Sequence, residues 1–88
     1  GIDNSNINLE LILYPNPTTS LVNLLVKDYN SEPIQYQLFD FNGRLLVNDK
    51  ISTTSTTIQM EQYPMAVYLL KVLESNKEVK TFKIMKTN

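Results

Sequence analysis

Short apolar segments separated by clusters of turn-forming residues recur about every ten positions along this chain, and this rhythm constrains its fold most strongly. In one such segment Ile34, Tyr36 and Leu38 alternate with two glutamines. A period of two places apolar side chains on one face of a β-strand and polar side chains on the other. We therefore expect packed sheets rather than helices.

The turn signals divide the chain into strands expected at residues 9–13, 21–27, 34–40, 44–51, 57–60, 67–73 and 78–86. The second of these is almost continuously apolar, as in a strand with little exposure on either face. Residues 52–57 contain only Ser and Thr and are expected to form a loop, although their high β-propensity leaves its boundary open. Strands of this number and spacing predict an all-β fold, a seven-stranded antiparallel immunoglobulin-like β-sandwich.

The last segment also fits a second pattern, because Val79, Phe82 and Met85 recur at every third position, as on a helix. Its β-branched residues and the lack of a capping residue before it favour a strand. In that strand Phe82 and Ile84 share one face, and Lys83 lies on the other.

Two turns can be predicted from local backbone chemistry. Pro15 and Pro17 flank Asn16, and because each proline fixes φ and lacks a backbone donor, the three residues interrupt regular structure after the first strand. Asn42 and Gly43 lie between two apolar runs, and both tolerate positive φ, so they predict a tight hairpin.

The tyrosines separate into two groups. Tyr36 and Tyr68 are in phase with aliphatic neighbours and are expected in the core, and Tyr68 is placed to form a tyrosine corner at the start of the sixth strand. Tyr14, Tyr29 and Tyr63 lie near turns. They would form the aromatic platform of an alternative function, an accessory module that binds carbohydrate or another extracellular partner.

Length and charge bound the possible partners. The 88 residues suffice for one domain with one core. The formal net charge of −1 gives no case for nucleic-acid binding, and the longest apolar run, residues 65–70, is far below the roughly 20 residues of a transmembrane helix. Residues 71–88 hold five Lys and two Glu, a net +3 that leaves −4 on the rest. These lysines could shield an edge strand or steer its docking onto an anionic partner's sheet.

The sequence gives little support for catalysis or for metal binding. The chain has no cysteine and no histidine, so thiolate ligands and the commonest general base are missing. Asp28, Asn30 and Glu32 alternate like the start of a calcium loop, but Pro33 and Phe39 stand where that loop needs glycine and a bidentate glutamate. We therefore predict no enzymatic activity, no metal and no cofactor.

Four segments carry a family resemblance through their order and spacing. They are Leu13-Tyr14-Pro15-Asn16-Pro17-Thr18, Leu38-Phe39-Asp40-x-x-Gly43-Arg44-Leu45, Val67-Tyr68-Leu69-Leu70-Lys71-Val72 and Lys80-x-x-Lys83-Ile84-x-Lys86. Over residues 9–88 the chain thus resembles the type A C-terminal sorting domain of the type IX secretion system of Bacteroidetes. One departure is Ala66, where the family commonly has glycine; alanine costs little there if φ is negative.

The resemblance implies an immunoglobulin-like domain that directs an attached cargo from the periplasm across the outer membrane, to the cell surface or the medium. The implied partners are the type IX translocon, a sortase-like cysteine peptidase and an upstream cargo domain in the same precursor. Residues 1–8 would be the linker to the cargo, with cleavage in or just before it, and residues 9–88 the sorting domain. The residues implied in sorting are Tyr14, Pro15, Asn16, Pro17, Asp40, Gly43, Arg44, Tyr68, Lys80, Lys83, Ile84 and Lys86.

Overall fold

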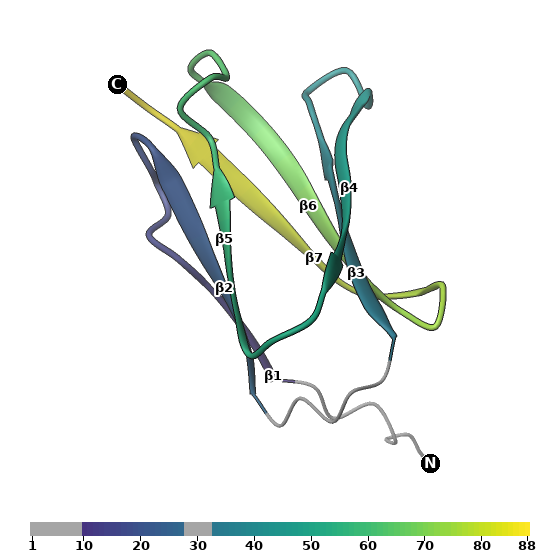
Figure 1. The fold of residues 1–88 in the computed structure, drawn as a ribbon. Coiled ribbons are helices and arrows are strands. Elements are labelled where there is room, and N and C mark those ends of the chain that lie inside the picture. Colours follow the sequence, from purple (N-terminus) through teal and green to yellow (C-terminus); the bar gives the residue numbers. More distant parts are fainter. Residues whose placement is uncertain (1–9, 28–32) are drawn as a thin grey trace.

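Two antiparallel sheets make up the fold (Figure 1). The computed structural model describes residues 10–27 and 33–88, so the expected linker 1–8 and the segment 28–32 lie outside the described residues. The strands are β1 (Glu10–Tyr14), β2 (Leu21–Lys27), β3 (Ile34–Phe39), β4 (Leu45–Ile51), β5 (Ser55–Gln59), β6 (Ala66–Glu74) and β7 (Lys77–Lys86). One sheet has the order β1-β2-β5 and the other β4-β3-β6-β7. The predicted all-β sandwich is confirmed, and the last segment is a strand, not a helix.

The core lies between the inner faces of the two sheets. Every second residue of β2, β3 and the middle of β6 is buried, as the two-residue period predicts. The buried apolar side chains are Val22, Leu24, Val26, Ile34, Tyr36, Leu38, Ile51, Ile58, Met60, Tyr68, Leu70, Val72 and Ile84. The predicted core positions of both tyrosines are therefore confirmed.

The predicted hairpin between β3 and β4 forms, but the backbone of its turn differs from the prediction at Asn42. Among the described residues, the non-glycine residues with positive φ are Ser75 at 51° and Asn76 at 69°, which form the two-residue turn between β6 and β7. Between β3 and β4 only Gly43 has positive φ, at 84°. The Gly43 N–H donates to the carbonyl oxygen of Asp40 at 3.0 Å, so one left-handed residue closes a longer turn.

Strand β5 begins earlier than predicted, at Ser55. Its Ser and Thr residues pair with β2, with Ser55 opposite Leu25 and Thr57 opposite Asn23. The Thr57 hydroxyl also donates to Oδ1 of Asn23 at 3.0 Å. These residues have high β-propensity although their polarity suggests a loop, and pairing with the central strand β2 makes them part of a strand.

Strand β7 contains an irregularity in its pairing with β6. Lys80 lies opposite Val72, but Leu73 lies opposite Glu78, so Val79 is an extra residue on β7. Such a bulge increases the local twist of the strand. Beyond it, Phe82 and Ile84 face inward and Lys83 is exposed, as predicted.

Candidate recognition site

One end of the sandwich gathers nearly all residues that the sequence implicated in sorting. This end, the motif pole, consists of residues 14–20, 40–44, 60–68 and 83–87. Figure 1 shows the β1–β2, β3–β4 and β5–β6 connections at the same end as the carboxyl end of β7. Lys80 is the exception, because it lies opposite Val72 in the other half of β7.

Asn16 joins the β1–β2 connection to β7. Its Nδ2 donates to the carbonyl oxygen of Lys83 at 2.7 Å, and its Oδ1 accepts from the N–H of Met85 at 2.9 Å. A side-chain amide therefore makes the two contacts that a peptide group of a neighbouring strand would make. The flanking peptide bonds Tyr14–Pro15 and Asn16–Pro17 are both cis.

Thr18 extends this contact along the edge of β7. Its N–H donates to the carbonyl oxygen of Met85 at 2.9 Å, and its own carbonyl oxygen accepts from Thr87 N–H at 2.8 Å. The Thr18 side chain is buried, and its hydroxyl donates to the carbonyl oxygen of Leu21. The outer edge of β7 between Lys83 and Thr87 is thus occupied, which corrects the expectation of a free edge for docking there.

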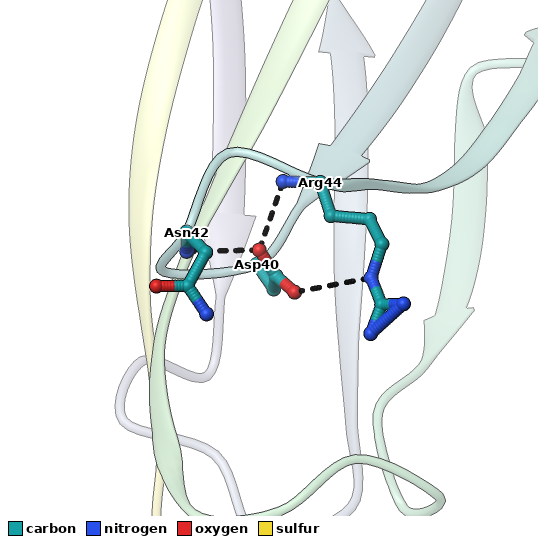
Figure 2. Close-up of polar contacts among 3 residues, drawn as sticks. All are labelled: Asp40, Asn42 and Arg44. Carbon is teal, nitrogen blue, oxygen red and sulfur yellow. Dashed lines mark hydrogen bonds and ion pairs between the residues drawn. The ribbon is translucent and has the colours of Figure 1, made fainter.

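Asp40 organises the β3–β4 turn (Figure 2). Its Oδ1 accepts from the N–H groups of Asn42 and Arg44, both at 2.9 Å, and its Oδ2 lies 3.7 Å from Nε of Arg44. The hydrogen bond from the Arg44 N–H, supported by that from Asn42, lowers the pKa of the Asp40 carboxyl below its ordinary value. Asp40, Gly43 and Arg44 therefore form one local unit.

Tyr68 forms the predicted tyrosine corner. Its ring is buried, and its hydroxyl donates to the carbonyl oxygen of Pro64, four residues upstream, at 2.6 Å. The ring of Tyr63 packs against it, with centroids 5.6 Å apart. Burial raises the pKa of Tyr68, and the nearby Asp40 charge adds to this effect. Because Tyr63 is half-buried against Tyr68, it does not form an exposed aromatic platform with Tyr14; Tyr29 lies outside the described residues.

Lys86 departs from the expectation of a solvent-facing lysine. It shares the inner face of β7 with Ile84 and is buried, and its Nζ donates to the carbonyl oxygen of Tyr63 at 3.0 Å. No carboxylate within the described ranges forms an ion pair with it. Lys86 therefore fixes the β5–β6 connection to the end of β7.

The implicated residues divide into a framework and a surface. Tyr68, Ile84 and Lys86 are buried, so no partner can contact them without unfolding the pole. Asp40 is half-buried in its turn, and the exposed residues are Tyr14, Pro15, Asn16, Pro17, Gly43, Arg44, Lys80 and Lys83. Ala66, the departure from the family pattern, lies in extended β6 with no positive φ and is paired with Lys86, so the substitution is accommodated.

Sequence reasoning did not foresee the contacts that Thr18 and Tyr63 make, and it did not single out several exposed apolar side chains near the pole. The clearest signal for the latter was Phe41, an apolar residue inside a turn, which is 79% exposed. The residues that the structure describes include no cluster of acidic residues able to hold a metal ion. They also include no helix long and apolar enough to cross a membrane.

Comparison with known families agrees with the geometry. A family model described as a secretion system C-terminal sorting domain matches residues 12–87. The match includes all four segments that form the motif pole. No match was found among curated proteins.

Proposed function

This chain belongs to the family of C-terminal sorting domains of the type IX secretion system, and on that premise we propose that its folded motif pole is the signal that the translocon binds. The domain acts by being recognised and carries out no reaction itself. Its cargo is the protein to which it is attached. The compartments involved are the periplasm during transit, and then the cell surface or the medium.

The observation that carries this proposal is the pair of hydrogen bonds made by Asn16. Its partners, Lys83 and Met85, are 67 and 69 positions away in the sequence. An unfolded chain contains every motif but lacks the surface on which they meet. The exposed residues Pro15, Pro17 and Arg44 come together at the motif pole only after both sheets have formed.

The course of the chain supports a separation between recognition and cleavage. Strand β1 begins with Glu10, paired with Lys27 at the end of the sandwich opposite the motif pole (Figure 1). A cargo attached before β1 would thus join the domain away from the surface that is bound. We infer that a sortase-like cysteine peptidase cleaves in or just before residues 1–8 after the translocon has engaged the pole.

A reporter fusion tests the proposal. Residues 9–88 are placed behind a reporter that is exported to the periplasm, in a host with a functional type IX system and in the same host without it. We expect the reporter outside the cell only in the competent host. Retention in the periplasm with the domain intact would contradict the proposal.

A second fusion tests whether the signal has to be folded. Leu70 is fully buried in the core, so Leu70→Asp should unfold the domain while every exposed motif residue remains. We expect this variant to stay in the periplasm. Export at the normal level would show that the linear sequence, rather than the folded pole, is recognised.

A further inference from the structure

We propose that the outer face of the four-stranded sheet is a second docking surface, which fits a protein partner combining apolar side chains with carboxylates. The surface is the apolar row, defined as Leu45, Phe39, Leu69, Val67 and Met85. This inference rests on the proposed function and extends it, because none of these five side chains is among the residues implied in sorting.

The strand register places the apolar row on one face. Phe39 lies opposite Leu45 on β4 and opposite Leu69 on β6, and Leu69 lies opposite Lys83 on β7. Val67 and Met85 form the next such pair towards the pole, since residues two apart along a strand share a face. Buried neighbours along the strands of Phe39, Val67, Leu69 and Met85 point into the core, so these four side chains face away from it. Leu45 joins them through its pairing with Phe39, next to an irregularity in the β3–β4 register.

The exposure of this face is unusual for a small soluble domain. Large apolar residues that are exposed there or in the adjoining turns are Leu45 at 46%, Leu69 at 36%, Met85 at 48%, Phe41 at 79% and Met65 at 61%. The other two in the described part of the chain, Ile12 and Tyr14, belong to β1. Leu45, Phe39 and Leu69 are adjacent through the strand pairing, and a contiguous apolar patch marks an interaction surface, whereas scattered apolar residues would not.

Cations border the apolar row. The Nζ of Lys71 lies 5.2 Å from the centre of the Phe39 ring, and Lys83 lies opposite Leu69 at the β7 end of the row. Apolar contact surrounded by positive charge is complementary to an apolar surface that carries carboxylates.

The same features favour a protein partner over a membrane or a second copy. Arg44 and Lys71 each already lie near a carboxylate, of Asp40 at 3.7 Å and of Glu78 at 3.8 Å. This leaves less free positive charge than the about four to eight cations of a lipid-binding cluster. Lys83, by contrast, forms no ion pair within the described ranges and keeps its charge, and two copies meeting through this face would bring such like charges together, which opposes self-association.

Charge substitutions in the reporter fusion test the surface. Leu69→Glu and Met85→Glu place a carboxylate on the row, and Ile12→Glu is the matched control, since Ile12 is 38% exposed on the other sheet. We expect export to fall at least about tenfold for the first two, as for a charged group forced into an interface anchor. The control should export like the parent, and urea unfolding of each purified domain should show that all remain folded.

The outcomes separate the two proposals. If the parent fusion is not exported, the proposed function fails; if it is exported and both row variants are too, only this inference is overturned. If the export loss of each row variant is fully explained by the fraction of its domain that is unfolded, this inference is overturned as well. If the domain sediments with phosphatidylglycerol vesicles and Leu69→Glu abolishes this binding, the face binds lipid. If the domain is a dimer in sedimentation velocity and Leu69→Glu makes it monomeric, the face binds a second copy. Either result would overturn the proposal of a protein partner.

Discussion

The ammonium group of Lys86 donates a hydrogen bond to the carbonyl oxygen of Tyr63, 3.0 Å away, from a residue that is only 7% exposed. Lys83, three positions earlier, points to the solvent side of the same strand. Two lysines of one sorting motif therefore have different physical roles: one holds the fold together and the other is available to a partner.

Replacing Lys86 should destabilise the domain. Lys86→Ala removes the packing of the buried aliphatic stem and the hydrogen bond to Tyr63, and we expect the free energy of unfolding to fall by about 1–3 kcal/mol. Urea unfolding measures this loss. Lys83→Ala is the matched control and should change stability by less than about 0.5 kcal/mol. Equal effects of the two changes would contradict the buried role of Lys86.

In the export assay, Lys83→Ala rather than Lys86→Ala should have the direct effect on recognition. Lys83→Ala should reduce export without loss of stability, whereas any defect of Lys86→Ala should follow its stability. Deletion of residues 83–88 cannot make this distinction, because it also removes buried Ile84 and the partners of Asn16. Point variants are therefore the sharper test of recognition.

Asn16→Ala should loosen the edge of β7. Loss of the bonds to Lys83 and Met85 should lower the free energy of unfolding by about 1–2 kcal/mol, given about 1 kcal/mol for each exposed hydrogen bond. Amide hydrogen exchange at Met85 should become faster, since its N–H loses the Asn16 acceptor. Asn42→Ala is the control, because Asn42 contributes its backbone N–H to the turn. Unchanged exchange at Met85 in Asn16→Ala would contradict the contact.

Asp40→Asn should change how stability depends on pH. The pKa of Asp40 is lowered in the folded state, chiefly by the Arg44 N–H, so the ionised carboxylate stabilises the fold above the ordinary aspartate pKa of about 4. That contribution is lost as pH falls through the folded pKa. The parent should therefore be more stable than the variant at neutral pH, and the difference should shrink in acid. Thermal unfolding at several pH values measures this difference. A difference in melting temperature between parent and variant that stays constant from neutral to acid pH would contradict this assignment.

Tyr68→Phe removes the hydroxyl that donates to Pro64 and should lower stability by about 1 kcal/mol in urea unfolding at neutral pH. Burial raises the Tyr68 pKa above 10.0, so the unfolded chain ionises first and the stabilising contribution is lost as pH rises through the folded pKa. The stability difference should thus narrow in alkali. Tyr14→Phe, at an exposed ring, should have little effect at neutral pH; an equal loss there would contradict the corner.

The inner faces of β3 and β6 could be predicted because alternation is a local property of the sequence. The hairpin at Asn42 and Gly43 could also be predicted, but its length could not, because Asn-Gly suits more than one hairpin and the Asp40 carboxylate binds the N–H groups of the longer one. The start of β5 depends on pairing with β2, which the Ser and Thr residues do not reveal.

The burial of Lys86 could not be predicted, because its charge suggests an exposed side chain. Its period with Phe82 and Ile84 places it on the inner face, but an ammonium group usually remains in water, so exposure was expected. The carbonyl oxygen that accepts its hydrogen bond belongs to Tyr63, 23 residues earlier in the sequence. Contacts of this kind, like that of Asn16, have no local signature in the sequence.

The protected edge of β7 has a consequence for behaviour at high concentration. An unpaired strand edge can template pairing between copies and lead to fibres. In β7 the first half carries the Val79 bulge and Lys80, which hinder such pairing, and the second half is closed by Asn16 and Thr18. Many copies crowded in one compartment would therefore have little tendency to pair through this strand. A chain without the Asn16 amide would expose the carbonyl oxygen of Lys83 and the N–H of Met85 to a neighbouring copy.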